Sequence, residues 1–340
     1  MITIREVASS AGVSPATVSK VINQRPDVGP EAIARVEQAV KALGYSPRNS
    51  GRPGGKAARE NRTNRIGLLI PGLPEAQVNS PVYMGVQHGV EEAARQGGRS
   101  LLLNRLPTRS GSVTELFPSR MDGVVLFGAT RNNQLKAKLR KIPCIQVMGG
   151  VEEHEPWDHV SYSNAQIGRL AAEHLLGRGH RHTALLSGSV DGHFGERQRS
   201  FREAIEGAGG TCLELVDKKL ILEGGAVQEV NRRVLAPLFD ALLRAEPRPR
   251  ALFMTADIFA AAAFGELLRR GLTPMTDLDL IACNNERLLL ASLYPAPATI
   301  DIHAREVGTR AVEQLLWRID HPEEEKVVSL LTPTLVPGEE

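Results

Sequence analysis

The chain has 340 residues, of which 42% are hydrophobic and 24% are charged, and its formal net charge at pH 7 is +2. These proportions are typical of a globular protein, and no run of uncharged apolar residues is long enough to predict a membrane-spanning helix. The start of the chain, Met1 to Glu6, lacks the basic and apolar segments of a signal peptide, so a cytoplasmic protein without a membrane partner is expected. Cys144, Cys212 and Cys283 are widely spaced and odd in number, which predicts reduced thiols and neither a disulfide framework nor a zinc site.

The charge is distributed unevenly along the chain. Residues 1–64 contain ten Lys and Arg against five Asp and Glu, whereas the remaining residues contain 31 against 34. A small basic head on a mildly acidic body indicates that the head binds a polyanion such as nucleic acid. An ordinary charged surface is the alternative.

Two short helices separated by a tight turn are predicted at the start of the chain. The run from Thr3 to Glu6 has the form of a capping box, and apolar residues at positions 4, 7, 8 and 11 mark one face of a helix. Gly12 ends this helix as a left-handed C-cap residue. Ser14 and Pro15 then begin the next helix as its N-cap and first-turn residues.

A third helix completes a small module. It begins at Gly29-Pro30, buries Ile33, Val36 and Val40, and ends at Gly44. Three short helices with a tight first turn predict a helix-turn-helix module, whose second helix enters the major groove of DNA.

Outward-facing polar residues on the second predicted helix are candidates for DNA contact. Lys20 can reach the acceptor atoms of guanine, and Thr17 or Asn23 can reach phosphates or base edges. Capped helical hairpins also occur inside ordinary helical bundles, so the pattern by itself leaves a purely structural hairpin open.

The same residues resemble a known family of regulators. The run from Thr3 to Asn23 closely resembles the opening of LacI-family regulators, and so does the run from Arg35 to Pro47. The match is dense over these two runs and continues more weakly to the C-terminus. It implies a helix-turn-helix DNA-binding domain at residues 1–46 and a repressor that binds double-stranded operator DNA.

The resemblance also implies which residues contact DNA. Base readout is expected mainly from Pro15, Ala16 and Lys20, and phosphate contact mainly from Thr17, Ser19 and Asn23. With two hydroxyls at helix starts and three linker cations, the complete set of candidate DNA-binding residues is Thr3, Ser14, Pro15, Ala16, Thr17, Ser19, Lys20, Asn23, Arg48, Arg52 and Lys56.

Residues 47–64 are basic, rich in glycine and nearly devoid of large apolar side chains, which predicts a linker. In the resembled family this segment forms a hinge helix with a leucine that wedges into the minor groove. Here Gly51 and the run from Pro53 to Gly55 interrupt any helix, and the leucine has no clear counterpart. Only the run from Lys56 to Asn61 retains a helical composition.

The linker admits two other mechanisms. Gly51-Arg52-Pro53, flanked by Arg48 and Lys56, resembles the core of an AT-hook, in which arginine lies in a narrow A·T minor groove. A flexible basic tether that adds only phosphate attraction is the alternative.

After Arg65, short apolar strands alternate with helical stretches. The expected strands are Ile66–Ile70, Ser100–Leu103, Gly123–Phe127, Ile142–Val147, Thr183–Leu186, Cys212–Val216, Leu252–Met254 and Leu280–Ala282. This alternation predicts parallel sheets covered by helices on both faces. The expected fold class is therefore an all-α helix-turn-helix domain followed by an α/β domain with two Rossmann-like parallel sheets and a cleft between them.

The resemblance implies that residues 65–340 form an effector-binding and dimerisation domain of the two-lobed, periplasmic-binding-protein-like type. The first lobe is expected at about 65–160 and 291–322, and the second at about 161–290 and 323–340. The first lobe and a helix from Gly308 to Trp317 are expected to form a homodimer.

Ligands of open parallel sheets bind beyond the carboxyl ends of the strands. The segments there are Pro71–Tyr83, Gly128–Arg131, Met148-Gly149, Ser187–Arg197, Asp257 and Asn284-Asn285. By resemblance, the candidate effector-binding residues are Val82, Tyr83, Ser163, Arg197, Asp257 and Asn284. Carboxylate, guanidinium and amide groups can bind vicinal hydroxyls and Tyr83 can pack on a ring, so a carbohydrate-like small molecule is expected.

Two departures from the family weaken the expectation of a carbohydrate. Ser163-Asn164 stands where an Asp-Asn pair is usual, and Asn284 stands where Asp is usual, which leaves a less polar or an anionic effector open. Taken alone, Arg197 is typical of a salt-bridge partner and Asp257 of a helix N-cap.

No catalytic residue, cofactor or metal is expected. A P-loop, a GxGxxG after the first strand and Gly-Xaa-Ser-Xaa-Gly do not occur, and His180 and His182 lack a further ligand at a usual metal spacing. His154 and His159 lie in a polar stretch near Trp157 and are expected to be solvated.

The sequence therefore predicts an effector-responsive transcriptional regulator that binds a palindromic operator as a homodimer. An intracellular solute-binding protein without a DNA role is the main alternative, against which the three-helix head counts. An α/β enzyme with a DNA-targeting head is the second, and it requires catalytic residues in the cleft.

Overall fold

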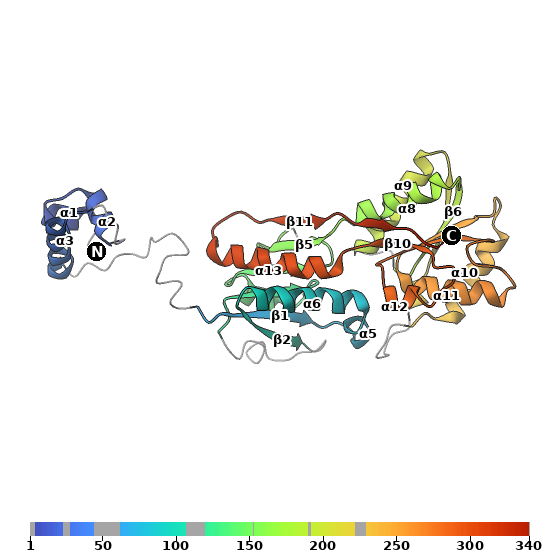
Figure 1. Cartoon of the computed structure of the whole chain (residues 1–340), viewed down its shortest axis with the longest axis horizontal. Helices are drawn as coiled ribbons and strands as arrows, with labels where there is room; N and C mark the ends of the chain where they lie inside the picture. Colours follow the sequence, from blue (N-terminus) through green and yellow to red (C-terminus); the bar gives the residue numbers. More distant parts are fainter. Residues whose placement is uncertain are drawn as a thin grey trace. The chain divides into compact units, whose positions relative to one another are not determined.

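Figure 1 shows the computed structural model of the chain, which describes residues 4–22, 28–43, 62–106, 120–151, 153–189, 192–221 and 229–339. Contacts divide the chain into two compact units, Met1–Glu60 and Asn61–Glu340. Most of the predicted linker, positions 47–61, lies outside the described residues.

The first unit contains the three predicted helices, α1 (Ile4–Ala11), α2 (Pro15–Ile22) and α3 (Pro30–Leu43). Gly12 ends α1 with a φ of 62°, and its N–H donates to the carbonyl of Ser9 at 3.3 Å while the N–H of Val13 donates to that of Ala8 at 3.1 Å. These two bonds form a Schellman motif, which satisfies carbonyls at the helix end. The helices enclose a core of Val7, Ala8, Ala11, Val18, Val36 and Ala39.

The second unit contains two lobes, each built on a six-stranded sheet. The first sheet has the order β11-β5-β4-β3-β1-β2, and all of its neighbouring strands are parallel. Its strands are β1 (Arg65–Pro71), β2 (Ser100–Leu106), β3 (Gly123–Phe127), β4 (Cys144–Val147), β5 (Asp158–Tyr162) and β11 (Val328–Leu331). Helices α6 (Pro81–Gln96) and α13 (Ala304–Asp320) cover one face, α7 (Asn133–Leu139) covers the other, and the short α5 (Glu75–Val78) precedes α6.

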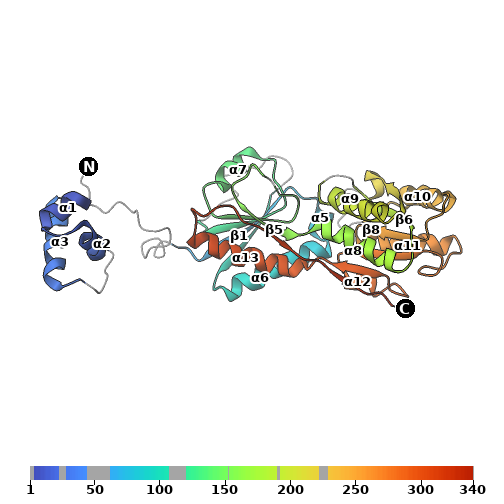
Figure 2. The ribbon, with the colours of Figure 1, turned by 90° about the horizontal axis from the view of Figure 1, so that it is seen from above.

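The second sheet has the order β12-β10-β9-β8-β6-β7 and is parallel except for its edge strand β12. Its strands are β6 (His182–Ser187), β7 (Thr211–Val216), β8 (Ala251–Met254), β9 (Asp279–Cys283), β10 (Ala298–Asp301) and β12 (Thr334–Val336). Helices α8 (Asn164–Gly177) and α9 (Gly192–Gly207) cover one face, and α10 (Arg232–Arg244) and α11 (Asp257–Arg269) cover the other. The short helices η1 (Lys218–Leu220) and α12 (Arg287–Leu290) belong to the same lobe, in which Figure 2 labels α12.

Alternating side chains within each strand explain why helices cover both faces of each sheet. In β8, Phe253 packs toward α8 and α9, whereas Leu252 and Met254 pack toward α10 and α11. Because successive side chains point to opposite faces, a continuous apolar strand must be covered twice.

Helices α6 and α13 lie in direct backbone contact (Figure 1). A Cβ atom on Gly89 would overlap the carbonyl oxygen of Arg305, and one on Gly308 would overlap that of Val86. Glycine at these two positions therefore sets the spacing of the helix pair.

A buried ion pair fixes the segment before β11. Asp158 is fully buried, and Nε and Nη2 of Arg318 donate to its two carboxylate oxygens at 3.1 and 2.7 Å. Arg318 also donates to the carbonyls of His321, Glu324 and Glu325. One guanidinium thus joins α13, β5 and the loop that leads into β11.

Two segments lie in the lobe opposite to the expected one. Strand β10 falls within 291–322, expected in the first lobe, but belongs to the second sheet; β11 falls within 323–340, expected in the second lobe, but belongs to the first sheet. The reason is that the chain passes between the lobes three times, after β5, after β10 and after β11.

None of the helices in the described part of the chain is long and apolar enough to cross a membrane. Cys144 and Cys283 are buried and Cys212 is half-buried, and all three are free thiols. His159, expected to be solvated, is instead buried in the first sheet with 1% of its surface exposed.

Candidate functional site

Helix α2 carries the candidate DNA contacts that the structure describes. The Oγ of Ser14 accepts a hydrogen bond from the N–H of Thr17 at 3.0 Å and shares a second one with the Thr17 hydroxyl at 2.9 Å. Ser14 therefore acts as the N-cap that the sequence predicts. Ser14, Pro15 and Lys20 are exposed, whereas Val18 is buried in the core.

Other candidate DNA contacts are only partly described. Ala16 and Ser19 lie on α2, but their side chains are outside the description. Thr3, Asn23, Arg48, Arg52 and Lys56 lie outside the described residues. Their contact with DNA stays a prediction.

A cavity of about 250 Å³ lies between the two lobes, at the carboxyl ends of their strands. This is where ligands bind in open parallel sheets. From the first lobe, the cavity is lined by Leu73, Gln77, Ser80, Val82, Tyr83, Phe127, Gly128, Met148 and Gly149; from the crossing strand and the second lobe, it is lined by Tyr162, Phe194, Arg197, Ala256, Asn284 and Glu286.

Four of the six candidate effector residues, Val82, Tyr83, Arg197 and Asn284, line this cavity. Ser163 does not, because its Oγ caps α8 by accepting from the N–H of Gln166 at 3.3 Å. Asp257 does not either, because it is fully buried behind the cavity wall at the start of α11.

Arg197 is buried, with 1% of its surface exposed. Its Nε and Nη2 donate to Oδ1 of Asn164 at 3.2 and 3.0 Å, and Nη1 donates to the carbonyl of Thr255 at 2.5 Å and to Sγ of Cys283 at 3.2 Å. Among the described residues, no carboxylate lies within ion-pair distance. A buried charge without a counterion is costly. The neutral partners of Arg197 fix the position of its cation but leave its charge unpaired, so an electron-rich ligand in the cavity would be stabilised there.

A carboxyl group stands in the same cavity at Glu286. The Nδ2 of Asn284 donates to its Oε1 at 3.2 Å. Burial, followed by the charge of Asp257, raises the pKa of Glu286 to about 7. Near neutral pH this side chain can therefore either donate or accept a hydrogen bond.

Asp257 holds the turn that carries Glu286. Its carboxylate oxygens accept from the N–H of Glu286 at 2.6 Å and from the Thr299 hydroxyl at 2.8 Å. Burial raises the pKa of Asp257 to about 6, although both hydrogen bonds lower it. Asp257 thus positions the cavity wall and does not border the cavity.

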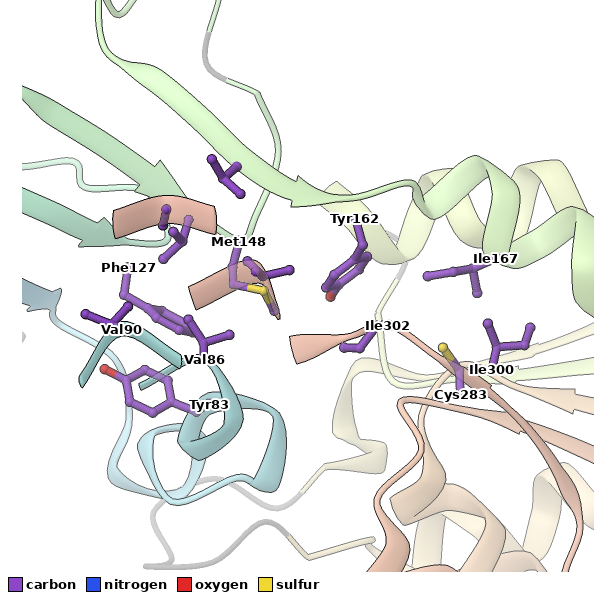
Figure 3. Packing of buried hydrophobic residues seen from close by; sticks show 14 of the residues in the cluster. Tyr83, Val86, Val90, Phe127, Met148, Tyr162, Ile167, Cys283, Ile300 and Ile302 are labelled. Atoms are coloured by element: carbon purple, nitrogen blue, oxygen red, sulfur yellow. The ribbon is translucent and has the colours of Figure 1, made fainter. Parts of the chain in front are cut away.

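Aromatic rings provide apolar walls (Figure 3). The Tyr83 and Phe127 ring centroids lie 4.1 Å apart. The guanidinium carbon of Arg197 lies 5.7 Å from the ring centroid of Tyr162 and 5.5 Å from that of Phe194, which is within the range of cation–π attraction. Burial also raises the pKa of Tyr83 well above its usual range, so this wall is uncharged.

Four lining residues lie outside the ligand-binding segments predicted from the sequence, namely Phe127, Tyr162, Ala256 and Glu286. Phe127 is the last residue of a predicted strand, and Tyr162 ends β5, a strand that was not predicted. Glu286 lies two residues after Asn284, and its carboxyl stands in the cavity even though the family's usual Asp at position 284 is absent.

Comparison with known proteins agrees with both units. The profile described as "Bacterial regulatory proteins, lacI family" matches residues 3–48, and that described as "Periplasmic binding protein-like domain" matches residues 172–339. The HTH-type transcriptional repressor PurR of Aliivibrio fischeri (strain ATCC 700601 / ES114) is 32% identical over 348 residues, which cover 99% of this chain and 97% of that protein.

Two solved structures share the fold along nearly the whole chain. A complex of the transcriptional regulator CelR with cellobiose has a TM-score of 0.65 at 24% identity, covering 100% of this chain and 99% of that one. The lac repressor dimer bound to operator and the anti-inducer ONPF has a TM-score of 0.65 at 21% identity, covering 99% and 98%. These matches confirm the expected fold class. With its helix-turn-helix head and two-lobed α/β body, the chain belongs to the LacI family of bacterial regulatory proteins.

Proposed function

We propose that this LacI-family chain is a cytoplasmic transcriptional repressor that binds a palindromic operator as a homodimer, and that a small effector between its lobes changes its affinity for DNA. The observation that carries the proposal is that one chain joins a capped α2 with an exposed Lys20 to a unit whose interlobe cavity holds the buried Arg197. An effector alters DNA binding to the extent that it prefers one arrangement of the lobes.

The proposed effector is a small carbohydrate-like molecule. Ligand pockets commonly range from about 300 to 1,000 Å³, and the cavity of about 250 Å³ lies below that range. Arg197, Asn284 and Glu286 supply hydrogen-bonding groups, while Phe127 and Tyr162 supply ring faces. The structure neighbour CelR is described with cellobiose, but the small cavity favours a single ring.

A panel of ligands tests this effector class. Binding of neutral monosaccharides to the full chain, measured by calorimetry, is expected, together with a change in operator affinity. Exclusive binding of small carboxylates would replace the carbohydrate with an anion that pairs with Arg197.

Homodimerisation supplies specificity that one small head lacks. Two heads related by a two-fold axis read half-sites about one helical turn apart. The first lobe exposes Met84 on α6, Leu103 on β2 and Trp317 on α13, and the second lobe exposes Leu288 and Tyr294 more fully, so pairing through the first lobe rests on the family resemblance. The lac repressor neighbour is described as a dimer on its operator.

The test of the DNA-binding proposal is selection of bound duplexes from a random pool at a stated near-physiological salt concentration. An enriched palindrome is expected, and its spacing measures the separation of the two heads. Binding without an enriched sequence would show that the head contributes only non-specific electrostatic attraction to DNA.

The Lys20→Ala variant tests the recognition helix. Loss of one specific base contact in each head is expected to weaken binding to the selected operator by about 1–3 kcal/mol per head, with little change on random DNA. Lys141→Ala, which removes an exposed lysine from the second unit, is the matched control for charge. Equal affinity of Lys20→Ala and wild type would place recognition elsewhere.

Two other functions make different predictions. A solute-binding protein without a DNA role binds the ligand panel but enriches no duplex. An α/β enzyme turns over a cavity ligand, and an assay of the bound ligand for chemical change tests it. The relatives, which are transcriptional repressors, support the regulator.

A further inference from the structure

Hydrogen bonds join the three crossings between the lobes to one another. Strand β10 pairs with β12 up to Asp301, which lies opposite Thr334, so the second and third crossings start from adjacent residues. The Nε2 of His303 and the hydroxyl of Thr334 form a hydrogen bond of 3.1 Å. The N–H of Ser163 on the first crossing donates to the carbonyl of Leu331 on the third at 3.1 Å. The crossings therefore form a single bonded hinge.

Asp301 lies at the start of the second crossing and faces away from the apolar core. Its neighbours Ile300 and Ile302 are fully buried in that core (Figure 3), and successive side chains of an extended segment point to opposite sides. The Oδ1 of Asp301 accepts from the N–H of His303 at 2.7 Å, and its Oδ2 accepts from Nδ2 of Asn285 at 2.8 Å. One carboxylate thus joins the hinge to the turn that follows β9.

Both partners of Asp301 have a backbone conformation that L residues other than glycine rarely adopt. The φ angle is 54° at His303 and 57° at Asn285. Such residues persist where surrounding bonds hold them, and they are frequent at ligand sites and switch regions. His303 directly precedes α13, and Asn285 lies between Asn284 and Glu286, which both line the effector cavity. The same carboxylate therefore holds a bend in the hinge and a bend in the cavity wall.

We propose that Asp301 is a positioning residue that sets the angle between the lobes and couples it to the wall of the effector cavity. Without its carboxylate, His303 is free to leave the left-handed region, and the direction in which the chain enters α13 changes. An effector that moves Asn284 and Glu286 acts on the hinge through Asn285 and Asp301. This regulatory role rests on the proposed function, whereas the hinge itself is measured without DNA or ligand.

The experiment measures the distance between two spin labels on the full-length protein by pulsed electron paramagnetic resonance. The labels are attached through Gln96→Cys on α6 of the first lobe and Glu203→Cys on α9 of the second, both exposed positions. The half-buried Cys212 is changed to serine, and an excess of unlabelled chain leaves at most one labelled chain in a dimer. We expect Asp301→Ala to shift the principal distance by about 2 Å or more, as hinge rearrangements do.

Three further variants make the test specific. Asn285→Ala removes one of the two bonds from its other end, so a shift in the same direction is expected, and the double variant should shift no further than Asp301→Ala. Asp301→Asn is expected to keep the wild-type distance, because its amide can accept from His303 and donate to an Asn285 amide that has turned over. Asp277→Ala is the matched control, since this carboxylate also accepts a backbone N–H, that of Thr273, but lies before β9 and far along the chain from the crossings.

Each contrary result removes a defined part of the proposal. A wild-type distance in Asp301→Ala would overturn the role in the hinge. A shift in Asp301→Ala without one in Asn285→Ala would overturn the coupling to the cavity wall. An equal shift in Asp301→Asn or in Asp277→Ala would attribute the effect to lost charge and overturn the positioning role. If wild type selected no operator, the proposed function would fail, whereas these distances would still report on the hinge.

Discussion

Among single residues, Glu286 makes the charge of the interlobe cavity, and with it the unfolding free energy, depend on pH. Its pKa is about 7 in the folded chain, compared with an ordinary value of 4.5. Between these values the native protein holds a proton that the unfolded chain has released. The unfolding free energy contributed by Glu286 is therefore fully present below about pH 4.5 and is lost as the pH rises through about 7.

The Glu286→Gln variant is expected to remove this dependence. The difference in unfolding free energy between wild type and variant should fall by at most about 1.4 kcal/mol per pH unit between pH 5 and 7 and level off above pH 8. Urea unfolding at several pH values measures it. His159 acts in the opposite direction, because its pKa is lowered to about 4 in the folded chain and the unfolding free energy that it contributes is lost as the pH falls from about 6.5. Subtracting the unfolding free energy of the variant from that of wild type at each pH cancels this contribution. A difference that stays constant with pH would show that Glu286 is ionised in the native state.

The chemistry of single residues is also where sequence reasoning reached its limit. Arg197 and Asn284 were assigned to the cavity by resemblance, and both line it. Ser163 and Asp257 carry suitable groups too, but Ser163 accepts from a backbone N–H of α8 and Asp257 accepts from the backbone N–H of Glu286. A polar side chain that caps a helix and one that faces a ligand differ by a rotation about the side-chain bonds. The spacing of residues along the sequence does not specify that rotation.

At the scale of elements, the close approach of α6 and α13 depends on Gly89 and Gly308, because a side chain at either position would overlap the backbone of the facing helix. The Gly308→Ala variant is expected to lose about 1–3 kcal/mol of unfolding free energy, because overpacking forces the two backbones apart. A Cβ there would also come within 2.8 Å of the Val90 nitrogen. Urea unfolding of the full chain is the measurement.

Gly177→Ala is the matched control for this helix pair. Gly177 is the last residue of α8, and an added Cβ would meet nothing within 4 Å. Alanine there is expected to leave stability unchanged or slightly higher, since it favours helix. If both variants lose the same stability, close packing of α6 on α13 is not the cause.

The central strands with continuous apolar runs were predictable, whereas the buried strand β5 was not. The central strands β1, β3, β8 and β9 are buried on both faces, and their Val, Leu and Ile residues indicate this directly. Strand β5 contains Asp158, His159 and Ser161, which resemble a loop in sequence. Its Asp158 is neutralised by Arg318, 160 residues later, and no local pattern predicts such a partner.

At the scale of the whole molecule, the proposed homodimer would bring two basic linkers to one operator. The Gly51-Arg52-Pro53 segment of the linker lies outside the described residues, so its contact with the minor groove rests on sequence alone. The Arg52→Ala variant is expected to weaken operators with an A·T-rich centre more than those with a G·C-rich centre, because a narrow minor groove attracts arginine. Parallel titrations of the two duplexes measure the ratio. Equal losses on both would leave the linker as an electrostatic tether.

The three passages of the chain between the lobes restrict how such a protein can be recombined. Neither lobe is a contiguous piece, since α13 and β11 complete the first and β12 edges the second. A truncation before β10 would remove β11 from the first sheet and β10 and β12 from the second. Neither half is therefore expected to fold as a fragment. Exchange of the second lobe between relatives therefore requires a cassette that replaces 163–303 and the final strand together, with its seams in the short crossings, while the DNA-binding head can be exchanged at a single seam.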